Sequence, residues 1–495
     1  MSPQEASTRF SERTLSVTPK GLRAGILDLG DLTMLGMAST APVFALSVTL
    51  GLIVSRVGDF APLALILGFL PVLFVVFAFR ELNAREPDCG SSFTWVRRAF
   101  GPSTGWLAGM ATAVASIVVL VNLGHVASQY LWFLASRGSW EVSPWLTIPT
   151  ALLIIAAMCW VNSRGIRIGE HVQRVLTYVQ YVALGILAVA LVVGVVARGA
   201  SQVFDWSWFD LGAALQDPGR LGQGVLLAVF LFWGWDTCFS LNEESDDPAR
   251  TPGRGALLST LALGLVYLAL TVLLMIFAST DSTGAGLGNP DNAGDVLGGL
   301  RDMALGPWGW IVLVSLLGSM LSGAQATVLP VTRSLLAMGR RGAIPSALGT
   351  VEPGTQAPRA ASVLVGISAG AYYLLLNALG AEIMVDSANA VTVFIAFYYA
   401  VTAFACVWMF RATLRDSARN LWLRGILPGL GGLLLAVAFV SAVVQWGNPE
   451  FSQTRLGGLG GTLAVAIVLA VLSAGLLFWA RFAPGTRAYF TAQES

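Results

Sequence analysis

The sequence predicts an all-α protein that crosses a lipid bilayer twelve times. Of its 495 residues, 55% are hydrophobic and only 12% are charged, whereas a soluble globular chain carries about 25% charged residues. Apolar stretches recur along the whole chain, and most reach the length of about 20 residues that a helix needs to cross the hydrocarbon core. The net charge of +1 gives no electrostatic basis for binding nucleic acid. We therefore expect the lipid bilayer, and no nucleic acid, as a partner.

The apolar stretches define the expected organisation of the chain. The twelve expected spans are residues 31–54, 61–82, 104–135, 147–161, 174–197, 222–243, 255–279, 308–337, 359–379, 387–411, 424–446 and 457–481. We divide the chain into a tail (1–30), a ten-helix core (31–411), two additional helices (412–481) and a second tail (482–495). Both tails are expected to be disordered, and because twelve is even, both should lie on the same side.

Basic residues indicate which side of the membrane is the cytoplasm, since arginine and lysine gather in cytoplasmic loops. A cytoplasmic N-terminus places most of the 29 basic residues on that side. The opposite side then holds only Arg56, Arg137, Arg198, Arg220, Arg301 and Arg455. The sequence therefore predicts a multi-pass protein of the cytoplasmic membrane with both termini inside. The first thirty residues show no signal peptide.

Two expected spans are interrupted at matching places in the two halves of the chain. Span one contains Pro42, which has no amide hydrogen and disfavours an unbroken helix but suits the first turn of a new one. Span six, five spans later, contains Gly234 between bulky aromatic residues. Paired interruptions of this kind mark the sites of transporters, near the middle of the bilayer. The alternative is that Pro42 only kinks its helix and Gly234 only permits close packing.

Four stretches of the chain resemble a known family. They are STAPVF at 39–44; ELN at 81–83 with PDCG at 87–90, Trp95, GP at 101–102 and GW at 105–106; GWD at 234–236 with NEE at 242–244 and PARTP at 248–252; and TRS at 332–334 with RRGAIP at 340–345. Together these stretches resemble the amino acid–polyamine–organocation (APC) superfamily, in the bacterial amino acid permease type. The resemblance covers about residues 25–410.

The resemblance implies a fold and a general activity. Members share the LeuT-like inverted-repeat fold of sodium-coupled neurotransmitter transporters, in which two sets of five helices have broken helices 1 and 6, followed here by two C-terminal helices. They are secondary transporters that work by alternating access. Two departures from the family pattern matter: Pro42 removes one amide donor at the first break, and Gln180 stands where some proton-coupled relatives have a lysine.

The expected substrate site lies around the two breaks. Freed amides at the start of a half-helix favour a carboxylate, freed carbonyls suit an ammonium group, and aromatic rings can bind a cation. The candidate substrate-binding residues are Ser39, Thr40, Ala41, Val43, Phe44, Asn122, Phe230, Trp233, Gly234, Trp235, Asp236 and Gln325. Sequence does not decide which of the aromatic rings of span six face the site.

Two ionisable residues inside expected spans are candidates for proton coupling, because a charge within the membrane is costly and is therefore often functional. Asp236 follows the second break, and could take up a proton or contact the substrate amine; alternatively it caps freed backbone amides. His125 in span three could carry a proton, or it could serve only as a neutral hydrogen-bonding group between helices.

Glu243 and Glu244 lie at the cytoplasmic end of span six and are candidate gating residues. They could pair with Arg97 or Arg98 of the loop after span two. The alternative is a solvated acidic end of a helix.

The most favoured function is secondary transport of an amino acid, coupled to a proton or, as a second choice, to sodium. Import of a polyamine such as putrescine, amino acid/amine exchange and a transport-incompetent sensor remain alternatives. We expect no cofactor, no metal site and no enzymatic activity, because no nucleophile–base arrangement is visible. The four cysteines have no CxxC spacing, which indicates buried apolar residues and not a disulfide framework.

Overall fold

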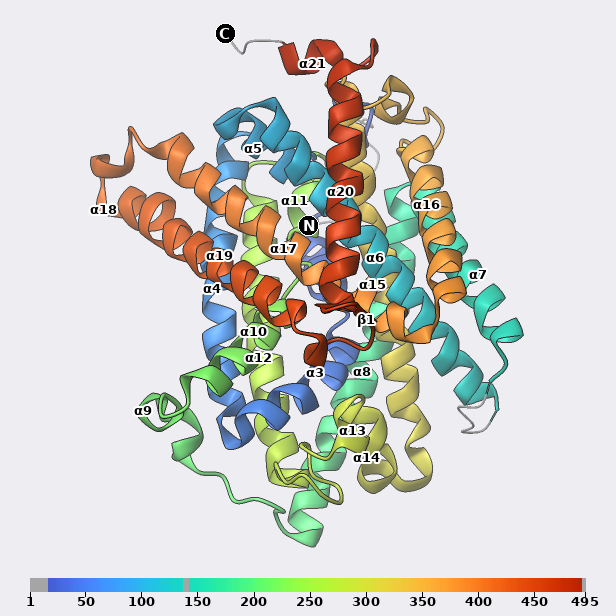
Figure 1. Cartoon of the computed structure of the whole chain (residues 1–495), viewed down its shortest axis with the longest axis vertical. Coiled ribbons are helices and arrows are strands. Elements are labelled where there is room, and N and C mark those ends of the chain that lie inside the picture. Colours follow the sequence, from blue (N-terminus) through green and yellow to red (C-terminus); the bar gives the residue numbers. More distant parts are fainter. Residues whose placement is uncertain (1–16, 137–141, 492–495) are drawn as a thin grey trace, which may run out of the picture.

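A computed structural model describes residues 17–136 and 142–491, and it shows a bundle of long helices (Figure 1). Within this part of the chain, 10 helical segments are long and apolar enough to cross a membrane. That number counts Leu29–Arg85 as one segment and leaves the apolar helix Pro218–Leu231 aside as too short. The protein is a multi-pass helical membrane protein, as predicted, while the exact number of twelve spans stays a prediction.

Each expected span corresponds to one or more helices. The long helices are α4 (Ala61–Arg85), α6 (Pro102–Ala135), α7 (Pro144–Ser163), α8 (Ile166–Arg198), α12 (Thr251–Ala278), α15 (Trp310–Arg340), α16 (Arg359–Leu379), α17 (Ala381–Phe410), α19 (Leu427–Gly447) and α20 (Gly461–Phe482). Shorter elements include α5 (Ser92–Phe100), α9 (Leu211–Ala214), α18 (Ala418–Asn420), the π-helix η7 (Leu421–Ile426), α21 (Arg487–Thr491) and a two-stranded hairpin, β1 (Arg455–Leu456) with β2 (Leu459–Gly460).

Both predicted breaks are present. Span one consists of α2 (Leu29–Ser39) and α3 (Pro42–Val57), joined through Ala41, whose backbone is left-handed at φ 46° and ψ 57°. Pro42 occupies the first turn of α3, where its missing amide hydrogen costs nothing. Span six consists of α10 (Pro218–Leu231) and α11 (Thr237–Ser240), with an irregular connection between them.

Gly234 lies at the second break and allows the two breaks to contact each other closely. Its φ of +125° strains any residue with a side chain. A Cβ atom at this position would lie 2.7 Å from the carbonyl oxygen of Ser39, at the end of α2. The glycine therefore allows the irregular part of span six to contact the break in span one directly.

The described ends of the chain lie on the same face of the bundle. Residues 17–28 contact the end of span six through hydrogen bonds from the Ile26 and Leu27 amides to the carbonyl of Glu244. At the other end, Tyr489 of α21 stacks on Phe93 of α5. We call this side the terminal face and the opposite side the distal face. The expectation of disordered tails is wrong for residues 17–30 and 482–491, because these residues form specific contacts with the bundle.

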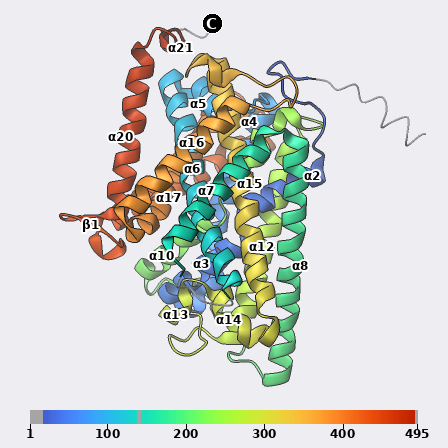
Figure 2. The same cartoon turned by 90° about the vertical axis from the view of Figure 1, so that its right-hand side faces the viewer.

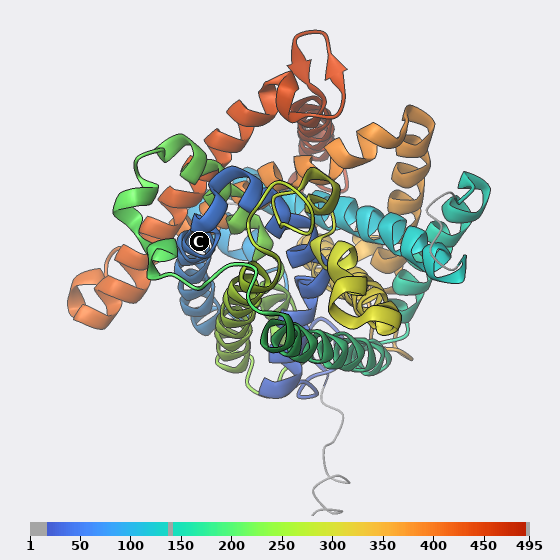
Figure 3. The ribbon, with the colours of Figure 1, turned by 90° about the horizontal axis from the view of Figure 1, so that it is seen from below.

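The longest distal connection, residues 280–305, contains two short helices, α13 (Pro290–Ala293) and α14 (Val296–Leu305). Seen from below, this segment lies over the middle of the bundle (Figure 3). Asp295 caps α14 by accepting a hydrogen bond from the Gly298 amide.

The core of the bundle surrounds α15, which packs against α6 and α8 and is buried along most of its length. In contrast, α20 stands at the edge of the molecule (Figure 2) and packs on α17. The buried carboxylate of Asp386 in α17 fixes the hairpin before α20 by accepting hydrogen bonds from Thr454 and Thr462. All four cysteines are buried and free, in agreement with the sequence analysis.

Candidate functional site

A cavity of about 670 Å³ extends from the break in span one to the distal face. Ser39 and Thr40 line its inner end, and Asp295 lies on its distal wall. Its walls come from α3, α6, α10, α17 and, unexpectedly, the end of α19, which contributes Gln445 and Trp446. The two C-terminal helices are therefore not separate from the site, because one of them forms part of its wall.

Seven of the predicted substrate-binding residues line this cavity. They are Ser39, Thr40, Ala41, Phe44, Asn122, Phe230 and Trp233. The rings of span six divide as helical geometry requires: Phe230 and Trp233 face the cavity, whereas Phe232 packs on Phe69 and Tyr267. This division answers the question that the sequence left open.

The other predicted residues lie behind the cavity wall. Trp235 packs on Phe79 and Tyr399. The side-chain nitrogen of Gln325 points toward α8, 3.5 Å from the carbonyl oxygen of Gly169. Val43, Gly234 and Asp236 are buried next to the breaks and are not among the lining residues.

His125 also points away from the cavity. Its Nδ1 lies 3.1 Å from the hydroxyl of Tyr373 in α16. This contact joins α6 to α16, which is the structural alternative raised for this residue. A role for His125 in proton transfer stays a prediction.

Asp236 is held by two tyrosines that the sequence analysis did not single out. Tyr398 and Tyr399 of α17 donate hydrogen bonds of 2.9 and 3.0 Å to its two carboxylate oxygens. The hydroxyl of Tyr398 in turn accepts a hydrogen bond of 2.6 Å from Nε1 of Trp233. Since Trp233 lines the cavity, Tyr398 connects the cavity wall to the buried carboxylate.

The backbone amides expected to bind a carboxylate are occupied by acceptors of the chain itself. The amides of Val43 and Phe44 both donate to Oγ of Ser319 in α15, at 3.2 and 3.3 Å. The Ala41 amide donates to the carbonyl of Ala38 at 3.0 Å. The two amides that converge on one oxygen atom have the arrangement in which a carboxylate oxygen would be held, but in this conformation Ser319 takes its place.

Asp295 is the one carboxylate among the described residues that line the cavity, and the sequence analysis did not select it. Its Oδ1 accepts a hydrogen bond of 2.5 Å from Ser47 of α3, and its Oδ2 accepts one from Tyr130 of α6. Asp295 therefore links the distal segment to two walls of the cavity. Its position in a loop rich in glycine and aspartate gave no sequence signal for this role.

The terminal side of the breaks is closed by a cluster of charged groups around Lys20, which is the only lysine of the chain. The Lys20 ammonium lies 2.6 Å from the carboxylate of Glu243 and 2.9 Å from that of Asp88. The Sγ of Cys89 lies 3.5 Å from the same nitrogen. We call these four residues the Lys20 cluster.

The Lys20 cluster brings distant parts of the chain together and keeps Asp88 ionised. Burial alone would raise the pKa of Asp88, but the charges of Lys20 and of Arg341, 3.1 Å away, outweigh that effect and lower it to about 2. The acceptor atoms of Asp88, Cys89 and Glu243 lie within 4.8 Å of one another, close enough to hold a metal ion. The Lys20 ammonium occupies that position here.

Glu244, the neighbour of Glu243, forms a separate and more deeply buried ion pair. Its carboxylate lies 3.0 Å from the guanidinium of Arg333 in α15, and their side chains are only 0% and 1% exposed. The expected partners of the two glutamates were wrong: Arg98 pairs with Glu86 and Arg97 lies over the ring of Tyr489. Both arginines belong to the last turn of α5. Glu86 neutralises Arg98, and the ring of Tyr489 in α21 contacts Arg97.

Comparison with known proteins identifies the family. A family model described as "Amino acid permease" matches residues 29–472. The chain belongs to this family. The match confirms the resemblance to APC superfamily permeases.

Three relatives illustrate the range of this family. The chain is 24% identical over 358 residues to the low-affinity putrescine importer PlaP of Escherichia coli K12, covering 71% of this chain and 75% of that protein. It is 23% identical over 292 residues to the branched-chain amino acid permease BcaP of Lactococcus lactis, covering 56% and 60%. It is 24% identical over 334 residues to the human large neutral amino acids transporter small subunit 2, covering 64% and 58%.

The fold is also found in a solved structure. The crystal structure of MhsT in complex with L-phenylalanine matches with a TM-score of 0.59 and 16% sequence identity, covering 84% of this chain and 100% of that chain. At this identity the likeness shows the fold alone, and it confirms the predicted inverted-repeat fold with broken helices. The family and the fold together identify the chain as a membrane transporter.

Proposed function

We propose that the protein takes up an amine-bearing solute, an amino acid in the first place, by alternating access, and that the terminal face lies in the cytoplasm. The observation that carries this proposal is the asymmetry of the site. A cavity reaches the two breaks from the distal face, whereas the Lys20 cluster and the Glu244–Arg333 pair close the terminal side. A cavity open on the distal side and closed on the terminal side is expected of an importer in the conformation that binds solute from outside the cell.

The lining of the cavity supports an amino acid with an apolar side chain. Phe44, Phe230 and Trp233 offer aromatic surface next to the first break, and Leu226 and Ile395 extend the apolar wall. The carboxylate would displace the hydroxyl of Ser319 from the amides of α3, and the ammonium would take freed carbonyls at the end of α2. The description of the family and two of its named relatives point to the same class of solute.

A diamine is the second candidate, because one observation favours it. The amides of Val43 and Phe44 already have an acceptor, and the ionisable groups among the described lining residues are Asp295 and the phenol of Tyr130. A solute with two ammonium groups needs no amide donors, and it could place one ammonium at the break and the other at Asp295. The similarity to a putrescine importer agrees with this alternative.

We further propose that Asp236 couples transport to a proton. When ionised, its carboxylate accepts hydrogen bonds from both Tyr398 and Tyr399. Once protonated, it must donate, and Tyr398 already accepts from Trp233. Protonation at Oδ2, the oxygen bonded to Tyr398, therefore requires the hydrogen of that hydroxyl to turn to another acceptor, which changes the support of a ring in the cavity wall. This sequence of contacts would connect the proton to the solute.

Transport assays in proteoliposomes test the solute and the ion. Labelled leucine and labelled putrescine are supplied with an inward pH gradient, an inward sodium gradient or neither. We expect accumulation of leucine with the pH gradient, and competition by excess putrescine in the same assay identifies a diamine carrier. Uptake that survives collapse of both gradients would show exchange, and no uptake or counterflow of any amine-bearing solute would refute transport.

Substitutions around Asp236 test the coupling. Asp236→Asn should abolish gradient-driven accumulation while sparing counterflow, and full accumulation in this variant would refute its role. Tyr398→Phe and Tyr399→Phe form a matched pair, because each removes one hydroxyl from the same carboxylate and only Tyr398 contacts Trp233. We expect the stronger loss of accumulation in Tyr398→Phe.

A further inference from the structure

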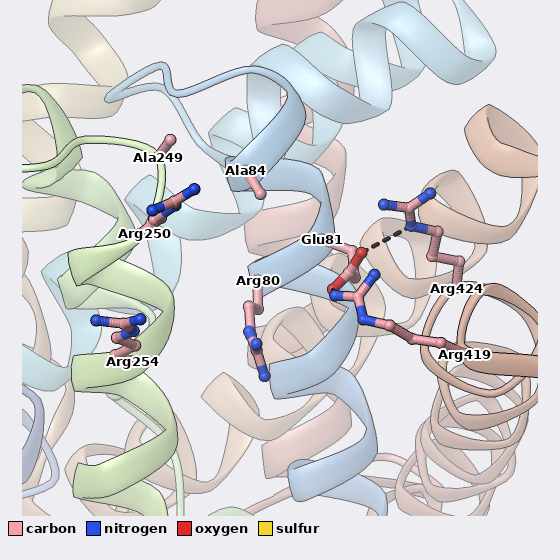
Figure 4. A pocket seen from close by; sticks show the side chains of 8 residues that line it. All are labelled: Arg80, Glu81, Ala84, Ala249, Arg250, Arg254, Arg419 and Arg424. Carbon is pink, nitrogen blue, oxygen red and sulfur yellow. Dashed lines mark hydrogen bonds and ion pairs between the residues drawn. The ribbon is translucent and has the colours of Figure 1, made fainter.

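A second pocket, of about 220 Å³, lies on the terminal face away from the transport cavity (Figure 4). We call it the arginine pocket. Its lining residues are Arg80, Glu81, Ala84, Ala249, Arg250, Arg254, Arg419 and Arg424. Arg80 and Glu81 come from α4, Arg250 and Arg254 from the start of α12, and Arg419 and Arg424 from α18 and η7.

The chain neutralises only part of this positive charge. Glu81 is buried and pairs with Arg419 at 2.9 Å and with Arg424 at 2.7 Å. Among the described residues, Arg80, Arg250 and Arg254 have no carboxylate within ion-pair distance, and their guanidinium groups take part in no hydrogen bond. Three arginines without a carboxylate partner therefore line a pocket whose one acid is already paired.

The position of these arginines adds to the cost of leaving them unpaired. Arg254 follows Arg250 by four residues, so it lies about 6 Å further along α12 toward the hydrophobic part of the span. An arginine at the edge of the hydrocarbon region is unfavourable unless it meets a counter-charge. Trp408 and Trp422, both about half exposed, lie on α17 and η7, as expected of aromatic residues at the membrane interface.

The shape of the pocket suits an anion. Ala84 and Ala249 are the two uncharged residues of its lining, and their side chains are small. A volume of about 220 Å³ corresponds to several water molecules at about 30 Å³ each, which is enough for a phosphate and the atoms attached to it. The π-helix η7 carries Arg424, and such local widenings of a helix are frequent at functional sites.

We propose that the arginine pocket binds the phosphate of an anionic phospholipid headgroup. The planar guanidinium forks of Arg80, Arg250 and Arg254 match phosphate oxygens in a bidentate manner, and basic pockets between membrane helices are suited to such headgroups. A lipid is favoured over free phosphate because the pocket lies between membrane-spanning helices, where acyl chains can cover the exposed apolar residues beside it. The bound headgroup would join α4 to the start of α12, beside the Glu81–Arg424 pair that already connects α4 to η7.

Thermal unfolding of the full-length purified protein in detergent tests this proposal. The ligands are dioleoyl phosphatidylglycerol, dioleoyl phosphatidylcholine, glycerol 3-phosphate and inorganic phosphate, each titrated over the same range. A ligand that binds the folded state raises the unfolding temperature, and above its dissociation constant the rise grows with the logarithm of its concentration. We expect the largest rise with phosphatidylglycerol and a small one with phosphatidylcholine, which has the same acyl chains without net charge.

Three variants show whether the pocket is responsible. In the double variant Arg80→Gln/Arg254→Gln we expect the apparent affinity for phosphatidylglycerol to fall about 25-fold, at about fivefold for each arginine near a membrane surface. Arg80→Lys/Arg254→Lys keeps the charge without the fork and should lie between. Arg415→Gln/Arg481→Gln is the matched control, because both residues are exposed arginines outside the pocket.

The possible outcomes divide clearly. A loss confined to the Arg80/Arg254 variants supports the proposal. An equal loss in the Arg415/Arg481 control would show unspecific attraction to basic residues and overturn it. Stabilisation by inorganic phosphate as strong as that by phosphatidylglycerol would assign the pocket to a free anion instead of a lipid. Because no step measures transport, failure of this proposal is independent of the proposed function.

Discussion

The two sides of the broken helices are built from different interactions. On the terminal side, ion pairs connect segments that are far apart in the chain: Lys20 to Asp88 and Glu243, and Arg333 to Glu244. On the distal side, Asp295, the one carboxylate that lines the cavity within the described part of the chain, is held by neutral hydroxyl groups. One side is closed by charges and the other is left open by polar and apolar residues.

This difference has a consequence for alternating access. The side chains of Lys20, Asp88 and Glu243 are 15%, 11% and 12% exposed, so their ion pairs can separate only as water enters and solvates both charges. We therefore expect the terminal closure to open together with hydration of the Lys20 cluster. A wall of aromatic and apolar residues instead closes around a solute of fitting shape. The Glu244–Arg333 pair is the exception, because it is fully buried and its separation would be costly. We therefore expect this pair to stay intact through the cycle.

The largest effect is expected from Arg333→Met. This substitution leaves the charge of Glu244 buried without a partner, which costs about 3–5 kcal/mol. The unfolding temperature in detergent should fall clearly. The double variant Arg333→Met/Glu244→Gln removes both charges and should recover most of the loss, whereas a single variant as stable as the wild type would show that the pair contributes nothing.

A second large effect is expected where the two sides meet. Gly234→Ala places a Cβ atom 2.7 Å from the Ser39 carbonyl oxygen in a backbone at φ +125°, and such strain costs about 1–3 kcal/mol. The two breaks must then separate, so transport should be lost. Gly222→Ala in α10, the first helix of the same span, is the control, because a Cβ there meets nothing within 4 Å. Equal transport by both variants would contradict the close contact between the breaks.

The breaks were predictable from sequence because their causes are local. Pro42 lacks an amide hydrogen and Gly234 permits a positive φ, and both properties belong to the residue itself. The partners of Glu243 and Glu244 were not predictable in this way. Lys20 is 223 positions from Glu243, and sequence alone offered no reason to prefer it over the arginines of α5.

The same distinction holds within the candidate site. Residues of spans one and six were found because they flank the breaks, and six of them line the cavity. The seventh predicted residue that lines it, Asn122, belongs to span three. Tyr398, Tyr399 and Asp295 were missed, because a tyrosine in an apolar helix or an aspartate in a polar loop has no local pattern that indicates its partner. Only the packing of α17 against span six and of α14 against α3 brings them to the site.

Lys20→Met should loosen the terminal side without unfolding the protein. It removes hydrogen bonds to two carboxylates, each worth about 1.5–3 kcal/mol when a charge is involved, so opening should become at least about tenfold more frequent. A variant that retains Cys89 as its sole cysteine reports this as faster labelling by a thiol reagent from the terminal face. Lys20→Arg keeps the charge and should label slowly; equal rates in all three proteins would contradict a closing role for Lys20.

The same labelling assay tests how the closure depends on pH. The pKa of Asp88 is about 2 in the folded protein and about 3.9 in an unfolded chain, so its contribution is complete above the higher value and is lost as the pH falls through the lower one. Because only the thiolate reacts with the reagent, each labelling rate is divided by the rate of the same variant unfolded in denaturant at the same pH. We expect this ratio to stay constant between about pH 5 and pH 8. A ratio that rises as the pH falls within this window would show that Asp88 does not stay ionised in the closed state.

The smallest effect is expected on the distal side, from Tyr130→Phe. The substitution removes one of two hydroxyl donors to Asp295, and a hydrogen bond of this kind contributes about 1–3 kcal/mol. Ser47 and the Gly298 amide still donate to Asp295, so the loss of stability should lie at the lower end of this range. The freed carboxylate oxygen then becomes available to a solute ammonium. If the Asp295 carboxylate binds the second ammonium group of a diamine, the concentration of putrescine that halves leucine uptake should fall several-fold. If putrescine competes as before while the rate of leucine uptake changes, Asp295 only holds the distal segment in place and does not take part in solute selection.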